Sequence, residues 1–183
     1  SALPQNLRNK SVLDMGCGTG YCTRGLQQRL PQYLSALDLA LPMLKKLKQS
    51  AICSTLLCAD AQSLPLQTAS LDLIVSSLTI QWCTDLPALF AELARVLKPG
   101  GKIFISTFGP ASLQEVAAAW RLVDSYTHVN SFFAADALQQ QAVKAGLNCS
   151  VQSEIISSHY ASLYDLSREL KALGAHNMNK TQA

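Results

Sequence analysis

Short apolar runs alternate with amphipathic stretches over the first 110 residues of the chain. Runs of about four to eight mainly apolar residues are typical of strands that are covered on both faces. They predict strands at residues 11–15, 33–39, 55–59, 71–78 and 102–108. Between them, apolar side chains recur every three or four residues, which predicts helices at residues 19–30, 42–49 and 85–97.

Turn and cap residues define two of these boundaries. Asp85 precedes Pro87 and a long apolar stripe, so we expect it to cap the helix over residues 85–97. The stretch LKPGG at residues 97–101 ends that helix and predicts a turn before the strand at residues 102–108.

The second half of the chain continues the pattern less regularly. Ser112 and Glu115 have the spacing of a capping box, and the helix that they predict carries apolar side chains at Leu113, Val116, Trp120 and Val123. We expect another helix over residues 135–146, a strand over residues 148–160 and a last helix over residues 163–174.

Strands that alternate with helices in this order predict an α/β fold with a doubly wound, mainly parallel sheet and helices on both faces. Parallel neighbours need a long crossover, and right-handed crossovers place helices on the two faces. With 183 residues, 49% hydrophobic and 15% charged, the chain is suited to one packed domain, which we expect over residues 1–183. Ligands of such sheets bind at the carboxyl ends of the strands, where the strand order reverses.

Composition narrows the function classes. A net charge of +3 without clustered Lys and Arg argues against a nucleic-acid partner. No apolar run in the sequence is long enough to cross a bilayer, and the first residues lack the layout of a signal peptide. The six cysteines form no CxxC pair and have no histidine at zinc-ligand spacing, so we expect reduced thiols and no metal site. Together, these features predict a cytoplasmic protein without a membrane partner.

The most informative motif is VLDMGCGTG, residues 12–20, which places Gly16, Gly18 and Gly20 directly behind the first strand. A tight turn needs one glycine rather than three, so the loop predicts a close approach to a ligand. The dinucleotide pattern GxGxxG fails at Tyr21, and no Lys-Ser or Lys-Thr pair follows to make a phosphate-binding P-loop. Asp14 would repel a pyrophosphate but attract a cation.

This motif resembles motif I of the class I S-adenosylmethionine-dependent methyltransferases, and with LKPGG the resemblance covers residues 11 to about 108. It implies S-adenosylmethionine as cofactor, with Asp38 accepting from the ribose hydroxyls, Leu39 against the adenine face and Asp60 with Ala61 near the adenine amino group. The remaining residues that it implies at the cofactor are Asp14, Gly16, Cys17, Gly18, Gly20, Tyr21 and Ser76.

The methyl acceptor has to be inferred from less general stretches. Residues 76–86 (SSLTIQWCTDL) and 162–177 (SLYDLSRELKALGAHN) are similar to the malonyl-acyl carrier protein O-methyltransferases of biotin synthesis. That resemblance implies methylation of the free carboxylate of a malonyl thioester, carried by acyl carrier protein or by CoA. It also implies a cofactor-binding half at residues 1–110 and a substrate-side half at residues 111–183 that contains an inserted helix at residues 163–174.

Within the substrate-side half, basic and polar side chains are candidates for orienting the acceptor carboxylate. Arg168 is the first choice, because a guanidinium can bind both carboxylate oxygens. The other candidates are His159, Tyr160, Lys171 and His176, while Gln81 and Trp82 are expected at the pocket. An acyl carrier protein is acidic, so Lys171 and Lys180 are candidates for docking it.

The chain also departs from the family, which usually has helices before the first strand and a last antiparallel strand, and we expect both to be missing from this chain. Three other functions stay open: a carboxyl methyltransferase for another small di- or tricarboxylate such as aconitate, a non-catalytic cofactor-binding or interaction module, and a nicotinamide dehydrogenase. Tyr21 and Asp14 disfavour the last of these. The sequence does not indicate an oligomeric state.

Overall fold

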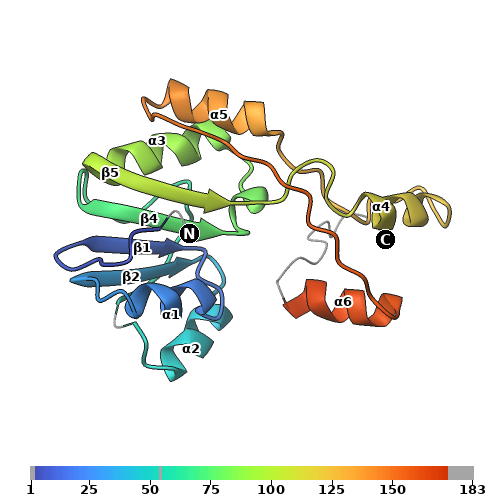
Figure 1. Cartoon of the computed structure of the whole chain (residues 1–183), viewed down its shortest axis with the longest axis horizontal. Coiled ribbons are helices and arrows are strands. Elements are labelled where there is room, and N and C mark those ends of the chain that lie inside the picture. Colours follow the sequence, from blue (N-terminus) through green and yellow to red (C-terminus); the bar gives the residue numbers. More distant parts are fainter. Residues whose placement is uncertain (1–2, 54, 173–183) are drawn as a thin grey trace.

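Five parallel strands form one sheet in the order β3-β2-β1-β4-β5 (Figure 1). The computed structural model describes residues 3–53 and 55–172. The strands are β1 (Ser11–Met15), β2 (Tyr33–Asp38), β3 (Thr55–Cys58), β4 (Leu71–Ser77) and β5 (Leu97–Ser106). The strand order reverses between β1 and β4, which confirms the expected doubly wound sheet.

Helices cover both faces of this sheet (Figure 1). One face carries α1 (Tyr21–Gln27) and α2 (Leu41–Gln49), and the other carries α3 (Leu86–Val96) and α5 (Ala135–Lys144). A short 3₁₀ turn, η1 (Ile80–Trp82), follows β4. The two remaining helices, α4 (Gln114–Arg121) and α6 (Leu163–Ala172), lie beyond the carboxyl ends of the strands, away from both covering layers.

The core consists of two apolar layers that the sheet separates. Side chains of a strand point alternately to its two faces, so Val12 joins the layer under α1 and α2, while Leu13 and Met15 join the layer under α3. Leu13 and Ile74 are fully buried, at 0% exposure. Burial of each such aliphatic side chain stabilises the fold by about 1.5–3 kcal/mol, so β1 and β4 are the best anchored strands.

The start of α3 confirms the sequence prediction for Asp85. The Ala88 N–H donates to Asp85 Oδ1 at 2.9 Å, and Pro87 lies within the first turn. The apolar stripe of this helix is buried, with Leu89, Leu93 and Val96 at 0% exposure. This helix therefore combines a side-chain cap with a continuous contact to the sheet.

Two predicted boundaries in the first half were wrong. The first helix ends at Gln27 rather than near residue 30, and Leu30 takes a positive φ of 57° and is exposed. β5 begins at Leu97, because the LKPGG stretch is a bulge within the strand and not a turn before it. Leu71 pairs with Leu97 and Leu73 already pairs with Lys102, so the register shifts between these pairs.

The capping box predicted from Ser112 and Glu115 is also wrong. α4 begins at Gln114, and its N-cap, Leu113, has a positive φ of 58° and makes no side-chain cap hydrogen bond. Val123, expected on the apolar stripe, lies beyond the helix and is 70% exposed. None of the α4 side chains is buried, because the helix extends from the sheet and does not pack on it.

The strand expected over residues 148–160 is absent from the described sheet, whose fifth strand is the last. Val151, Ile155 and Ile156 are exposed and find no layer to pack against. In an extended strand, the adjacent Ile155 and Ile156 would point to opposite faces, so neither face would be continuously apolar. Register and pairing are weakly specified in such a sequence. The segment instead crosses from α5 to α6 as an extended connection (Figure 1).

Among the residues that the structure describes, no helix is both long enough and apolar enough to cross a membrane. All six cysteines are free thiols.

Asp85→Ala should lower the free energy of unfolding by about 1 kcal/mol, because the Ala88 N–H loses its only side-chain acceptor. Urea unfolding of the purified protein measures this difference. Glu115→Ala is the matched control, since Glu115 is an exposed acid in the first turn of α4, whose start has no side-chain cap hydrogen bond. Equal losses in the two variants would contradict a capping role.

Candidate functional site

The carboxyl ends of β1, β2, β3 and β4 bring the predicted cofactor residues to one edge of the sheet. The glycine loop, residues 16–20, leaves β1, Asp38 ends β2, Asp60 follows β3, and Ser76 lies near the end of β4. This edge contains the switch point between β1 and β4, where doubly wound sheets bind ligands.

Two glycines fix the shape of the loop. Gly16 has a φ of +73°, and a Cβ there would lie 2.0 Å from Thr79 Oγ1, so no larger residue fits against the turn after β4. Gly18 has a φ of +52°, but a Cβ there would meet no atom within 4 Å. Gly16 is therefore required for packing inside the protein, whereas Gly18 faces open space that a ligand can approach.

The N–H groups of the loop are mostly used inside the protein. Gly16 and Cys17 both donate to the Leu37 carbonyl, at 2.7 and 2.9 Å, and the Gly20 N–H donates to the Cys17 carbonyl at 2.8 Å. The Gly18 N–H donates to Asp38 Oδ2 at 2.8 Å. A phosphate-binding loop instead points its N–H groups at the anion. The arrangement thus disfavours a pyrophosphate ligand and, with it, a nicotinamide dehydrogenase.

Asp14 lies beneath this loop with 1% of its surface exposed, and it accepts a 2.5 Å hydrogen bond from Thr23 Oγ1. Burial, together with the neighbouring Asp38 carboxylate, raises the pKa of this carboxyl to about 6, in spite of the lowering effect of the Thr23 hydrogen bonds. A cation bound over the loop would favour the ionised form. Because Asp14 is buried, its carboxylate could act on such a cation only through the electrostatic potential beneath the loop.

Asp38 and Asp60 present acceptor oxygens at the same edge. Asp38 Oδ1 accepts from the Ala40 N–H at 2.8 Å, and Asp60 Oδ1 accepts from the Gln62 N–H at 2.8 Å. Neither carboxylate forms a salt bridge with a basic side chain of the described residues. Each carboxylate oxygen has more than one acceptor site, so both can also accept hydroxyl or amino groups of a ligand.

Apolar side chains and one buried hydroxyl without a hydrogen-bond partner complete this part of the site. Leu39 is 70% exposed directly beside Asp38, whereas Ala61 is buried, and Tyr21 projects into solvent from the start of α1. Among the described residues, Ser76 Oγ is the one buried side-chain oxygen or nitrogen without a hydrogen-bond partner. Carboxylates without a salt bridge, the exposed Leu39 and the open side of Gly18 fit a cationic nucleoside without phosphate groups.

A separate cavity of about 140 Å³ lies between η1, α4 and α6. Aromatic side chains form much of its wall, namely Trp82, Phe108, Trp120 and Phe132, and the leucines of α6 close it from the other side. Of the two residues expected at the pocket, Trp82 lines it. Gln81 is buried, and it joins η1 to the end of β5 because its amide donates to the Leu78 carbonyl at 2.8 Å and accepts from Thr107 Oγ1 at 3.1 Å.

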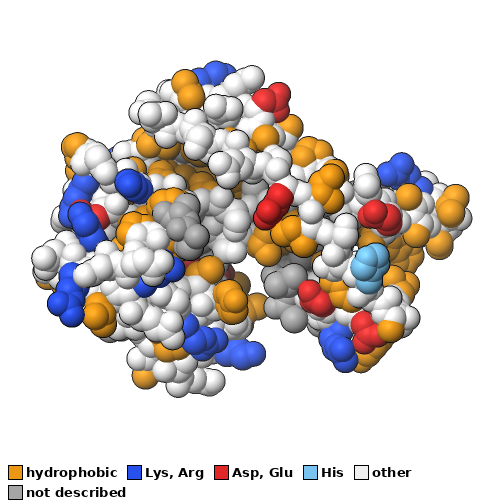
Figure 2. Space-filling model, viewed as in Figure 1, with side chains coloured by type: hydrophobic (Ala, Val, Ile, Leu, Met, Phe, Trp, Pro, Cys, Tyr) orange, Lys and Arg blue, Asp and Glu red, His pale blue; other side chains and the backbone are white. Residues whose placement is uncertain are grey.

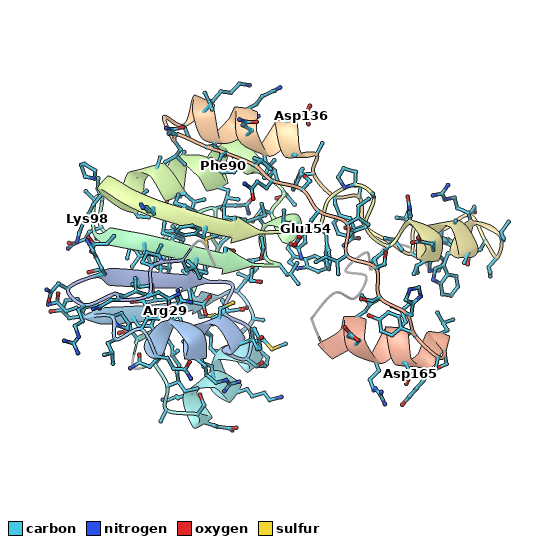
Figure 3. All side chains as sticks on the ribbon, in the orientation of Figure 1. Arg29, Phe90, Lys98, Asp136, Glu154 and Asp165 are labelled. Atoms are coloured by element: carbon cyan, nitrogen blue, oxygen red, sulfur yellow. The ribbon has the colours of Figure 1, made fainter. Side chains whose placement is uncertain are left out.

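The residues predicted to orient a carboxylate do not meet at this cavity. Arg168 forms an exposed ion pair with Asp165 at 3.2 Å, on the side of α6 that faces away from α4, where Figure 3 labels Asp165. His159 is exposed, Tyr160 is half-buried, and neither lines the cavity. Lys171 is in the last turn of α6, while His176 and Lys180 lie outside the described residues.

Sequence reasoning missed His128, which lines the cavity beside Trp120. Its ring stacks on the Trp120 indole at a centroid distance of 4.0 Å, and its Nε2 lies 2.8 Å from Asp124 Oδ1. The spacing of Asp124 and His128, four residues apart after a helix that carries Trp120, was the only signal in the sequence.

Several curated proteins are similar to almost the whole chain. It is 46% identical over 183 residues to the biotin biosynthesis bifunctional protein BioHC of Cellvibrio japonicus, covering 99% of this chain and 36% of that protein. It is 39% identical over 171 residues to the malonyl-[acyl-carrier protein] O-methyltransferase of Serratia marcescens, covering 93% of this chain and 66% of that protein. The chain thus spans about a third of the first relative and just under two thirds of the second.

Solved structures share the fold. A putative methyltransferase in complex with the Haloferax volcanii Trm112 activator matches with a TM-score of 0.68 at 23% identity, over 84% of this chain and 67% of that one. The S-adenosylmethionine-dependent methyltransferase of Mesorhizobium loti matches with a TM-score of 0.64 at 22% identity, over 79% of this chain and 76% of that one. These likenesses support the Rossmann-like architecture of the sheet.

The buried Asp14 should make stability depend on pH. The folded chain holds the proton of this carboxyl more tightly than the unfolded chain, so stability falls as pH rises from about 4 to 6. In ligand-free protein at pH 7.5, Asp14→Asn should therefore raise the free energy of unfolding by about 1–3 kcal/mol, and this gain should vanish near pH 4. Urea unfolding across this pH range measures it, with the exposed Asp136→Asn as control. A gain that is constant with pH would contradict the assignment.

The glycine loop, Asp38, Asp60 and the paired core of the sheet all fall within one recognisable unit. Residues 13–105, about half of the chain, match the family model described as a methyltransferase domain. Together with the strand order and the structural neighbours, this match places the chain in a known family. The chain belongs to the methyltransferase domain family.

Proposed function

We propose that this chain uses S-adenosylmethionine to methylate the free carboxylate of a malonyl thioester, an early step of biotin synthesis. The observation that carries the proposal is the edge of the sheet, which presents carboxylates and few free N–H groups for a phosphate, together with the aromatic cavity. Identities of 39–46% to proteins named for malonyl-acyl carrier protein methylation and biotin biosynthesis support it. A cytoplasmic location is part of the same proposal.

The residues at the edge fit this cofactor. Asp38 would accept from the ribose hydroxyls, Asp60 from the adenine amino group, and Leu39 would lie against the adenine ring. The loop at Gly18 and the buried Asp14 would receive the positively charged methionine end, and Ser76 Oγ would gain a partner. When bound, S-adenosylmethionine supplies a methyl group on a positively charged sulfur.

The acceptor chemistry asks little of the protein in proton transfer. A malonyl carboxylate is ionised near pH 7, so its oxygen can attack a methyl group without a general base. The protein has to hold that oxygen in line with the methyl group and keep water away. The aromatic wall formed by Trp82, Phe108 and Trp120 provides such a dry space next to the end of β4.

The carrier of the malonyl group is a finer part of the proposal. We favour acyl carrier protein over CoA, because five of the relatives are named for that carrier protein. Lys171 and Lys180 are retained as proposed contacts to its acidic surface. Encounter with an acidic protein depends on long-range charge attraction, which salt screens.

The full-length protein should transfer a methyl group from S-adenosylmethionine to malonyl-acyl carrier protein, with the methyl ester identified by mass spectrometry. The rate with the carrier protein should fall steeply between low and physiological salt, and the rate with malonyl-CoA much less. Free malonate and aconitate are the controls. Faster transfer to aconitate would replace the proposal with a small-acid methyltransferase, and cofactor binding without any transfer would favour a non-catalytic module.

Gly18→Ala should weaken S-adenosylhomocysteine binding at least about tenfold, because its Cβ would occupy the open space beside the loop. Isothermal titration calorimetry measures this loss. Gly100→Ala is the matched control, since Gly100 also has a positive φ, of 77°, and an open Cβ position, but lies at the amino-terminal end of β5. Both variants should lose about 1–2 kcal/mol of stability from backbone strain. Equal affinity in the two variants would contradict the cofactor site.

A further inference from the structure

We propose that His128, held by Asp124 and Trp120, binds the acceptor carboxylate in the cavity between α4 and α6. The inference rests on the proposed function and deepens it, because it assigns the group that recognises the negatively charged end of the substrate. It also replaces the sequence-based choice of Arg168, which pairs with Asp165 and does not line the cavity.

His128 is fixed from two sides. Its ring stacks on the Trp120 indole at 4.0 Å with an angle of 18° between the planes, and its Nε2 lies 2.8 Å from Asp124 Oδ1. The connection that carries it is anchored to the sheet, because Phe132 packs on Phe108 with ring centroids 5.2 Å apart. The imidazole plane therefore has one orientation relative to the cavity.

Asp124 occupies one of the two ring nitrogens of His128 and leaves the other available. Asp124 Oδ1 also accepts from the Tyr126 N–H at 2.9 Å, and this bond together with the one to His128 lowers the pKa of the Asp124 carboxyl. Nδ1 makes no hydrogen bond to any described residue, so this ring nitrogen is available to a ligand.

The rest of the cavity offers no alternative cation. Of the described residues that line it, His128 alone can carry a charge, and the others are aromatic, aliphatic or neutral polar. Burying a carboxylate in such a place is unfavourable unless a charged, hydrogen-bonding partner is present. Figure 2 shows hydrophobic side chains exposed on the α4 and α6 lobe as well, in keeping with a largely apolar acceptor region.

Two wall residues of the cavity are linked to the cofactor edge through short stretches of chain. Trp82, in its wall, is three residues from Thr79, whose Oγ1 donates to the Gly16 carbonyl at 3.3 Å. The second wall residue, Phe108, follows the end of β5. The hydrogen bond between Thr107 and Gln81 connects this segment to η1. A carboxylate held by His128 would thus approach the site from the side of β4 and β5.

A comparison of two thioesters of the same shape tests the inference. Binding of malonyl-CoA and of its neutral isostere isovaleryl-CoA is measured calorimetrically on the full-length protein saturated with S-adenosylhomocysteine. The wild type should prefer malonyl-CoA by about 10- to 100-fold, as for a charge-assisted hydrogen bond. His128→Gln should reduce the preference to about twofold or less, while S-adenosylhomocysteine binds as before.

Two further variants keep the test decisive. Arg121→Gln removes an exposed positive charge from α4 and should keep the full preference. Asp124→Asn leaves His128 in place but should lower the preference severalfold, so it decides the matter if His128→Gln fails to bind S-adenosylhomocysteine. In steady-state assays, His128→Gln should raise KM for the malonyl thioester more than it lowers kcat.

Several outcomes would overturn the inference. The inference is wrong if the wild type shows no preference for malonyl-CoA, or if His128→Gln retains that preference. It is also wrong if the preference is lost in Arg168→Gln instead. A loss confined to kcat in His128→Gln would make His128 a general base for a hydroxyl acceptor. The proposed function fails separately, if the wild type methylates no malonyl thioester. In that case, a malonyl preference that disappears in His128→Gln would still support a carboxylate site in this cavity.

Discussion

The attachment of the glycine loop to the end of β2 is the interaction on which the rest of the site depends. The Leu37 carbonyl receives the N–H groups of Gly16 and Cys17, and the Asp38 carboxylate receives that of Gly18. These bonds hold the loop over the buried Asp14 and place Asp38 at the edge of the sheet. They also occupy N–H groups with which an anion would otherwise bind, so one set of hydrogen bonds fixes the shape of the site and removes donors for a phosphate.

The sequence was a reliable guide wherever a residue's environment is set by its neighbours in the sheet. Val12, Leu13 and Met15 alternate between two covering layers, and the apolar run of β4 lies between β1 and β5, so periodicity alone identified both strands. Asp85 was recognisable as a cap because the bond that it makes is local. The three glycines followed from the same logic, since a positive φ is a property of single positions.

Prediction failed where the deciding contact is remote or absent. Nothing near Ser112 reveals that α4 starts two residues later in a projecting lobe, and the apolar residues at 151, 155 and 156 resemble a strand until no covering layer is found. The LKPGG stretch resembles a turn because its bulge depends on the register of β4. His128 was missed because its role depends on three contacts, with Asp124, Trp120 and the cavity, of which periodicity shows none.

The projecting position of α4 has an evolutionary consequence. No α4 side chain is buried, so substitutions there cost the sheet little of its stability, whereas substitutions in β1 or β4 disturb the core directly. The proposed cofactor site thus lies on the most constrained part of the molecule, and the proposed acceptor site lies beside one of the least constrained. A protein built in this way can acquire new methyl acceptors by drift in one lobe while its cofactor and its thermodynamic stability stay the same.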